Sequence, residues 1–286
     1  MFLAYIVIFF VLIVAYSWLI EPMAFNIQKI KAHVPGNNAR VLFISDFHMG
    51  RGRFWFRYTL LLRKIMAVQN ENALDAILLG GDYLDFDIRY LPQLEKFVEE
   101  LSRLNVKMYA VLGDHDHKKI DPELIRNALR KHNVVVLEDE LVDLGSWRLF
   151  GAKELRFDVE YDVKKNGRNV PDGTREKIRN RVREMNPEIG GTPLIVISHN
   201  PDAVYFRQIP AESLVIAGHT HGGQIWPLTW FGYRSWKFVP GGTFGSWSGR
   251  CEIEKKQLII SNGVGCSAWP LRLGRRPDVL VVQISG

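Results

Sequence analysis

Cysteine is scarce in this chain, which has only Cys251 and Cys266 among its 286 residues. Two cysteines cannot build a disulfide framework, and without a Cys pair at metal-ligand spacing a zinc finger is excluded. This usage fits a reducing compartment. Internal repeats and low-complexity tracts are absent as well. With 47% hydrophobic residues, the chain can bury a full core as one or two globular domains.

Neither sign of charge is in strong excess. Lys and Arg number 37 against 31 Asp and Glu, which gives a net charge of +6 and a pI near 9.3. This modest excess suits anionic substrates or anionic lipid surfaces, and it does not by itself indicate a nucleic-acid partner. We therefore expect no nucleic acid among the partners, and no obligate protein partner is evident.

Long hydrophobic runs are absent except for one, which extends from Phe2 to Ile20 without a charged residue. About 20 apolar residues span a bilayer as a helix. A cleavable signal peptide is the competing interpretation, but the chain has no Lys or Arg before Gln28, and residues 17–20 are bulky for a cleavage site. We expect an uncleaved transmembrane anchor over residues 1–21, with the bilayer as a partner.

The cations nearest the anchor all follow it, which predicts a folded domain on the cytoplasmic face of the inner membrane. They are Lys29, Lys31 and Arg40. Residues 22–40 are expected to form a juxtamembrane connection or an edge strand, and residues 41–286 the folded domain. The charged stretch 154–191, with a helix near 173–185, is either a cap or insertion or a solvated surface.

Five short apolar segments are typical of buried strands, and each is followed by Asp or His. They are 41–45 before Asp46 and His48, 76–79 before Asp82, 109–113 before Asp114 and His115, 194–198 before His199, and 214–218 before His219 and His221. One such strand end is commonly structural. Five together indicate a site, because open α/β folds bind ligands at the carboxyl edge of their sheets.

The residue types at these strand ends suit hard-to-borderline divalent ions such as Mn, Fe or Zn. The candidate ligands are Asp46, His48, Asp82, Asp114, His199, His219 and His221. Their number exceeds the need of one tetrahedral ion and suits two octahedral ions that share a ligand. We expect two divalent ions as cofactors, Mn first, with Fe, Zn or Mg as alternatives.

In order and spacing, five motifs resemble those of the calcineurin-like metallophosphoesterases, over roughly residues 41–284. They are Asp46-x-His48, Gly81-Asp82-x-x-Asp85, Gly113-Asp114-His115-Asp116, Ser198-His199 and Gly218-His219-Thr220-His221. The resemblance implies an α/β fold, a four-layer α-β-β-α sandwich, here preceded by the transmembrane helix. It also implies metal-dependent hydrolysis of phosphoric esters or pyrophosphates.

The same resemblance implies the role of each residue. One ion would be held by Asp46, His48, Asp82 and His221. The other would be held by Asp82, Asp114, His199 and His219, with Asp82 bridging. His115 would lie beside the phosphate as a catalytic residue, oriented by Asp85.

Two positions depart from the family pattern. Asp114 stands where the family usually has Asn, which adds a negative charge and removes an amide donor. Phe86 stands where the serine/threonine protein phosphatases carry a phosphate-binding Arg, which argues against a protein phosphatase.

The finer resemblance is to a membrane-associated bacterial branch that includes phosphodiesterases and a UDP-2,3-diacylglucosamine pyrophosphatase of lipid A biosynthesis. It rests on residues 198–202, 218–225, 261–265 and 270–272. We therefore expect an amphiphilic phosphorylated substrate, with UDP-2,3-diacylglucosamine as the specific expectation. Segment 51–58, which interleaves cations with aromatics, is either a membrane-interface surface or a solvated helix face with core aromatics.

Two other functions remain open. One is a nuclease or cyclic-nucleotide phosphodiesterase. The other is a metal-poor, non-catalytic scaffold, to which Asp114 is the only pointer.

Overall fold

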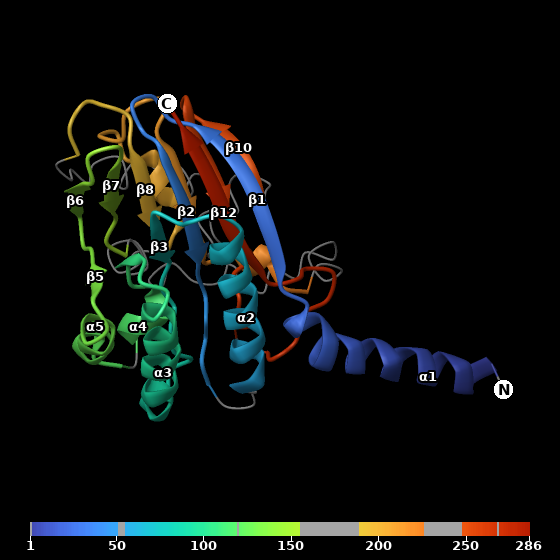
Figure 1. Ribbon diagram of the computed structural model, residues 1–286. Helices are drawn as coiled ribbons and strands as arrows, with labels where there is room; N and C mark the ends of the chain where they lie inside the picture. The colour runs from blue at the N-terminus through green and yellow to red at the C-terminus, as the bar shows by residue number, and fades with distance from the viewer. Residues whose placement is uncertain (1, 51–54, 119, 155–188, 226–247, 268) are drawn as a thin grey trace, which may run out of the picture.

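Two β-sheets packed face to face form the body of the protein in the computed structural model (Figure 1). The structure describes residues 2–50, 55–118, 120–154, 189–225, 248–267 and 269–286. Within these residues each sheet has six strands. Helices pack on the outer face of the first sheet, so the protein has the α/β architecture that the sequence predicts.

The first sheet has the strand order β1-β12-β2-β3-β4-β5. Its strands are β1 (Asn26–His33), β2 (Ala39–Ile44), β3 (Ala76–Leu79), β4 (Lys107–Ala110), β5 (Val134–Val136) and β12 (Asp278–Ser285). The run from β2 to β5 is parallel, which places the carboxyl ends of these strands along one edge.

The second sheet has the strand order β10-β11-β9-β8-β7-β6. Its strands are β6 (Glu140–Asp143), β7 (Arg148–Gly151), β8 (Ile195–Ser198), β9 (Leu214–Ala217), β10 (Gly249–Ile253) and β11 (Lys256–Ile260). The four inner strands are parallel and the two edge strands antiparallel. The carboxyl ends of β8 and β9 therefore also share one edge.

Five α-helices lie in the described residues. They are α1 (Phe2–Ala15), α2 (Trp55–Glu71), α3 (Leu91–Ser102), α4 (Asp114–Lys118) and α5 (Pro122–Arg130). Helix α5 begins after an N-cap, because the Asp121 carboxylate accepts a hydrogen bond from the Glu123 amide at 3.0 Å. The short helix α4 is not predicted by the apolar spacing, since all five of its residues are charged or titratable.

Successive side chains along a strand point to opposite faces of the sheet, and this alternation divides the buried residues into separate apolar layers. Leu42 and Ile44 of β2 pack toward the helices, together with residues of α2 and α3. Val41 and Phe43 point the other way, into a second apolar layer shared with β8 and β9 of the other sheet. A third cluster covers the far face of the second sheet. Each parallel strand is thus buried on both faces, which explains the continuous apolar runs in the sequence.

Strand β1 corrects the predicted domain boundary. It pairs with β12 along its whole length, from Asn26 opposite Asp278 to His33 opposite Ser285. Of the two interpretations of residues 22–40, the edge strand is confirmed. The α/β body therefore begins at Asn26 rather than at residue 41.

Some predicted segments lie outside the described residues. These are nearly all of the predicted cap at 154–191, with its helix near 173–185, and residues 51–54. In the described end of segment 51–58, Arg57 and Tyr58 are buried whereas Phe56 is exposed. Arg57 and Tyr58 are therefore parts of the core, and the burial of Tyr58 agrees with the interpretation that includes core aromatics.

The apolar N-terminal helix extends away from the body of the protein (Figure 1). Among the described residues, one helical stretch is long and apolar enough to cross a membrane. It extends over Phe2–Met23, and only 6% of its apolar part is buried inside the protein. A signal sequence meets the same criteria of length and composition.

Candidate metal centre

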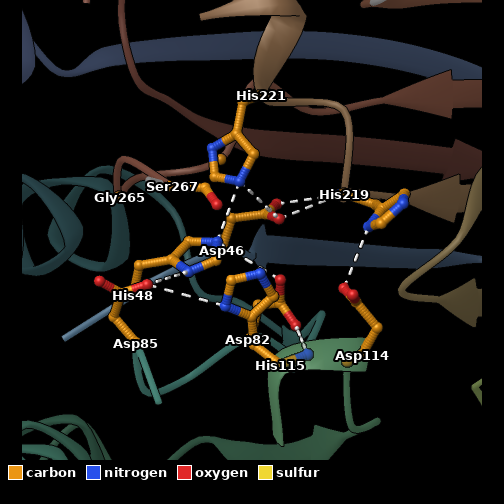
Figure 2. Close-up of polar contacts among 12 residues, drawn as sticks. Asp46, His48, Asp82, Asp85, Asp114, His115, His219, His221, Gly265 and Ser267 are labelled. Carbon is orange, nitrogen blue, oxygen red and sulfur yellow. Dashed lines mark hydrogen bonds and ion pairs between the residues drawn. The ribbon is translucent and has the colours of Figure 1, made fainter. Parts of the chain in front are cut away.

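Strand ends from both sheets meet at one buried point (Figure 2). The carboxyl ends of β2, β3 and β4 lie opposite those of β8 and β9, and the turns after them supply the side chains. The structure brings together all nine predicted site residues, namely Asp46, His48, Asp82, Asp85, Asp114, His115, His199, His219 and His221. All are buried except Asp85, which is half-buried.

Four of these side chains form one group, with ligand atoms within 4.8 Å of one another: Asp82, Asp114, His199 and His219. His199 Nε2 lies 3.4 Å from Asp82 Oδ2 and 3.4 Å from Asp114 Oδ1. His219 Nδ1 lies 3.4 Å from the same Asp114 oxygen. The other nitrogen of His199, Nδ1, lies 2.8 Å from the Gly80 carbonyl, which fixes its proton there and leaves Nε2 for a cation.

Asp46, His48 and His221 form a second group. His48 Nε2 lies 2.9 Å from His221 Nε2, which in turn lies 3.5 Å from Asp46 Oδ1. Both Asp46 oxygens accept a hydrogen bond from the His219 amide, at 3.0 and 3.1 Å. The backbone of one group therefore holds a side chain of the other.

Asp82 connects the two groups. Its Oδ2 atom lies 3.3 Å from His48 Nε2 on one side and 3.4 Å from His199 Nε2 on the other. Its second oxygen, Oδ1, accepts a hydrogen bond from the His115 amide at 2.9 Å. The carboxylate is thus fixed by a backbone donor while its other oxygen faces both sets of imidazoles.

The donor set fits two divalent cations. Imidazole nitrogens and carboxylate oxygens are ligands of Mn, Fe and Zn. Adjacent ligands about 2.1 Å from an octahedral cation lie about 3 Å apart. The nitrogen atoms of His48 and His221 are 2.9 Å apart, and those of His199 and His219 are 3.0 Å apart. Both spacings agree with neighbouring positions around a shared ion.

The electrostatics of the site also favour cations. Burial raises the pKa of Asp46. Burial would raise the pKa of Asp82 too, but the neighbouring His199 holds it below its ordinary value. For His199 burial alone would lower the pKa, yet Asp82 and the hydrogen-bonded Asp114 raise it well above the ordinary value. Buried carboxylates in such numbers require compensating positive charge.

The backbone is strained at the site. Five of the candidate ligands have left-handed backbone conformations, with φ values of 58° at Asp46, 44° at His48, 55° at Asp82, 70° at His219 and 51° at His221. Residues other than glycine seldom adopt this region, and such conformations gather at functional sites, where the surrounding structure enforces them. The strain therefore supports a functional site independently of the residue types.

Gly218 shows how closely the loops pack here. A Cβ atom at this position would lie 2.1 Å from Ser45 Oγ and 2.4 Å from Asp46 Oδ2. Only glycine lets the turn after β9 approach the Asp46 carboxylate without displacing it.

His115 lies at the edge of the site, between Asp85 and Phe86. Asp85 Oδ1 lies 3.7 Å from His115 Nδ1 and also 3.7 Å from His48 Nδ1. Asp85 thus faces two histidines, His115 and His48, at the same distance. The Phe86 ring stacks on His115, with centroids 3.9 Å apart and planes at 20°. Burial lowers the pKa of His115 to about 3, so its imidazole is neutral.

Asp116 is a functional residue that the sequence reasoning missed. Its Oδ2 atom accepts hydrogen bonds from the amides of Asp82 and Gly113, both at 2.8 Å, and its Oδ1 atom accepts from the Tyr83 amide at 2.9 Å. Burial and then the Asp82 charge raise the pKa of Asp116 to about 8. Asp116 thus joins the turns after β3 and β4. Its place in the 113–116 motif was the only signal, because the turn that it binds is distant in sequence.

The charge that Asp114 adds has a partner. Lys118, one helical turn later in α4, pairs with Asp114 Oδ2. The departure from the family's Asn is therefore compensated locally. His117 of the same helix is half-buried, and its Nδ1 atom lies 2.9 Å from the Gly113 carbonyl.

Comparison with known proteins agrees with this geometry. The calcineurin-like phosphoesterase family matches residues 39–223. The phosphodiesterase YaeI of Escherichia coli is 26% identical over 273 residues, which cover 92% of this chain and 90% of YaeI. A transmembrane protein with a metallophosphoesterase domain from Danio rerio is 25% identical over 262 residues, 85% of this chain and 52% of that protein.

The lengths of the relatives differ. The chain spans 63% of a metallophosphoesterase from Campylobacter jejuni, with 23% identity over 91% of this chain. Among solved structures, a dimetal phosphatase from Danio rerio superposes with a TM-score of 0.47 and 14% identity, over 87% of this chain and 100% of that one.

Proposed function

This chain belongs to the calcineurin-like phosphoesterase family and is a metal-dependent phosphoester hydrolase, and we propose that it cleaves a phosphodiester or pyrophosphate bond of a membrane-associated substrate. One observation supports the dinuclear chemistry above all others. Asp82 Oδ2 lies 3.3 Å from His48 Nε2 and 3.4 Å from His199 Nε2, so one carboxylate belongs to both ligand groups. A shared carboxylate is what two neighbouring cations require.

We assign each candidate ligand to one of two cations, with Mn as the preferred metal and Fe, Zn or Mg as alternatives. One set is Asp46, His48, Asp82 and His221; the other is Asp82, Asp114, His199 and His219. When bound, such cations supply Lewis-acid polarisation of the phosphoryl group and a water of lowered pKa. The chain contributes a buried cluster of ligands, three of which are already positioned by backbone hydrogen bonds.

His115 is assigned to the phosphoryl group. Its neutral imidazole is held between the Phe86 ring and the Asp85 carboxylate, which faces Nδ1. Once protonated, the ring can stabilise charge on a phosphoryl oxygen or protonate the leaving oxygen. Asp85 orients the ring through its charge.

The base of the N-terminal helix is built into a loop that borders the centre. The backbone amide of Arg272 donates to the Ser17 carbonyl at 2.8 Å, and the Gly274 amide donates to Glu21 Oε2 at 3.0 Å. Glu21 is buried at the point where the helix ends. These contacts place the apolar helix beside the catalytic body, which supports a substrate drawn from a bilayer.

A third contact reinforces this junction. Arg57 of α2 is buried and donates to the Pro22 carbonyl at 3.0 Å and to the Val264 carbonyl at 2.5 Å. Two tryptophans near the junction, Trp18 and Trp269, are exposed. Tryptophan favours the boundary between hydrocarbon and water. We propose that this side of the protein faces the membrane.

The N-terminal helix and the charges after it also bear on where the protein lies in the cell. The apolar stretch Phe2–Met23 and the relative from Danio rerio named a transmembrane protein support membrane anchoring. The excess of cations after the helix supports a cytoplasmic placement at the inner membrane. Those cations are Lys29, Lys31 and Arg40.

UDP-2,3-diacylglucosamine is the specific substrate that we propose, in lipid A biosynthesis. We expect the full-length protein, purified in detergent and loaded with Mn, to convert it to a lipid monophosphate and UMP. The physical reason is that the substrate combines a pyrophosphate for the metal centre with acyl chains for the bilayer. Mass spectrometry of the products measures the outcome. Absence of the lipid monophosphate would remove this substrate and leave the hydrolase class intact.

A nucleotide phosphodiesterase is the second candidate. The name of the E. coli relative, a phosphodiesterase, favours it. Binding of nucleic acid through phosphates weakens steeply with salt. Turnover of DNA, RNA or cyclic nucleotides that survives raised salt would favour this candidate over the lipid. The hypothesis of a metal-poor scaffold rested only on Asp114. This residue lies in one ligand group, where its Oδ1 atom can serve as a metal ligand, so the hypothesis loses that support.

The Asp114→Asn variant is expected to turn over substrate at a rate equal to that of the parent or up to about fivefold higher, a change of about 1 kcal/mol. Asn retains an oxygen ligand, removes a charge that repels phosphate, and adds an amide donor. The gain is small because Lys118 already pairs with Asp114. Steady-state kinetics with Mn measure it, with Lys118→Met as the companion variant. A loss of more than tenfold would show that this site needs the carboxylate.

A further inference from the structure

One buried hydroxyl at the centre has no hydrogen-bond partner among the described residues. Ser267 is 2% exposed, and its Oγ atom makes no hydrogen bond to any of the described residues. Figure 2 shows this hydroxyl on the side of the site where His48 and His221 lie, directed toward them. Leaving a buried hydroxyl unsatisfied is unfavourable, and each such group in a folded protein requires an explanation.

The other buried serines in the described part of the chain set the contrast. Each has a hydrogen bond from or to its Oγ atom: Ser17 with the Val14 carbonyl, Ser45 with Gly80, Ser198 with Asn200, Ser213 with the Leu194 amide, and Ser261 with Asp278. In this fold a buried serine is ordinarily satisfied within the protein. Ser267 departs from that rule at the metal centre.

The position of Ser267 is fixed by a side chain from the loop that carries two candidate ligands. Gln224 accepts a hydrogen bond from the Ser267 amide at 2.9 Å and donates to the Ser267 carbonyl at 3.0 Å. Gln224 is itself buried and has a left-handed φ of 42°. Gln224 lies three residues after His221, so its two hydrogen bonds connect the Ser267 backbone to the ligand loop.

The chain just before Ser267 is equally constrained. The Gly265 amide donates to the Asp46 carbonyl at 2.6 Å, and a Cβ atom on Gly265 would lie 2.2 Å from the Phe47 carbonyl oxygen. The fully buried Arg272 guanidinium donates to the carbonyls of Gly265 and Asn262, at 2.6 and 2.7 Å. An unpaired hydroxyl on such a rigid segment cannot reach a partner by a small shift of the backbone.

We propose that Ser267 is a substrate-binding residue, whose hydroxyl donates a hydrogen bond to a non-bridging phosphoryl oxygen of the substrate. The inference rests on the proposed function. It adds to the metal ligands of the site an uncharged hydrogen-bond donor that binds the substrate. A serine hydroxyl carries one proton to donate, and phosphoryl oxygens are strong charged acceptors. A phosphoryl oxygen of the bound substrate would thus be the acceptor that the Ser267 hydroxyl lacks among the described residues.

The test compares Ser267→Ala with Ser213→Ala, in the full-length protein loaded with Mn. Inorganic phosphate is the probe, and its Kd is measured by calorimetry beside metal content and thermal unfolding. We expect Ser267→Ala to retain the metal content and the melting temperature of the parent, and to weaken phosphate binding by about 10- to 100-fold, since hydrogen bonds to charged groups are strong. The value of kcat/KM should fall by a similar factor.

The control responds in the opposite way. Ser213 accepts a hydrogen bond from the Leu194 amide at the amino ends of β8 and β9, whereas the ligands follow the carboxyl ends of these strands. Ser213→Ala should therefore lower the melting temperature and leave phosphate binding unchanged. A phosphate Kd for Ser267→Ala within twofold of the parent overturns the inference. Failure of the parent to bind phosphate at millimolar concentration overturns it too. If the parent binds phosphate but cleaves no phosphoester, the proposed function fails while the Ser267 comparison still stands.

Discussion

The Asp82→Ala variant is expected to lose at least about a thousandfold in kcat/KM, because a dinuclear centre contributes several kcal/mol and about 1.4 kcal/mol corresponds to a factor of ten. The Asp82 carboxylate is the one group that lies within 3.4 Å of imidazoles from both ligand groups. Its removal should lower the bound Mn from two ions per chain to one or fewer. Kinetics and elemental analysis of the same preparation measure both effects.

Asp121→Ala is the matched control for Asp82→Ala. Asp121 caps helix α5, where its carboxylate accepts the Glu123 amide, so its loss should cost about 1 kcal/mol of folding free energy. The metal content and kcat/KM should stay at parental values. Asp82→Ala with two bound ions and activity within tenfold of the parent would contradict the shared-ligand arrangement.

A single methyl group at Gly113 is expected to lower kcat/KM by about a hundredfold, since displacement of a catalytic group by about 1 Å has effects of this size. A Cβ atom there would lie 2.2 Å from Asp82 Oδ1 and 2.6 Å from the Asp82 amide nitrogen. The carboxylate would have to move, although Oδ1 is held by the His115 amide at 2.9 Å. Gly113→Ala changes no ligand, so the loss would come from position alone.

Gly191→Ala is the control for this variant, because a Cβ atom at Gly191 meets no atom of the described residues within 4 Å. It should leave kcat/KM and metal affinity unchanged. Titration of Mn into the metal-free proteins should show weaker binding for Gly113→Ala alone. Parental activity in Gly113→Ala would mean that Asp82 can shift without consequence, which is incompatible with its proposed role.

The strands that position the site could be predicted from the sequence for a physical reason. Parallel strands buried on both faces require continuous apolar runs, so Ala76–Leu79 stands out from its surroundings. The residue at the end of such a run must lie at the edge of the sheet. Asp82 and Asp114 could therefore be assigned to one site before their distance in space was known.

Contacts between loops could not be predicted in this way. The Asp116 carboxylate binds the turn at Asp82 and Tyr83, and the Gln224 amide binds Ser267, but neither contact has a periodic signal. Arg272 is a stronger case, because an arginine is ordinarily exposed and this one is fully buried among carbonyls. These residues acquire their roles only when the loops close on one another.

The pairing of β1 with β12 had the same limitation. The strand Asn26–His33 alternates poorly, as expected for an edge strand, and its partner begins at Asp278 near the other end of the chain. Local sequence cannot specify such a distant partner. The metal-site ligands were easier to assign because each lies within a few residues of its own strand.

The most direct test of the central claim is anomalous scattering from crystals of the Mn-loaded protein, collected on both sides of the Mn absorption edge. We predict two peaks about 3.5–4 Å apart with Asp82 between them, the separation usual for two-metal sites. One peak is expected beside Asp46, His48 and His221, and the other beside Asp114, His199 and His219. A single peak, or two peaks of which only one contacts Asp82, would contradict the account.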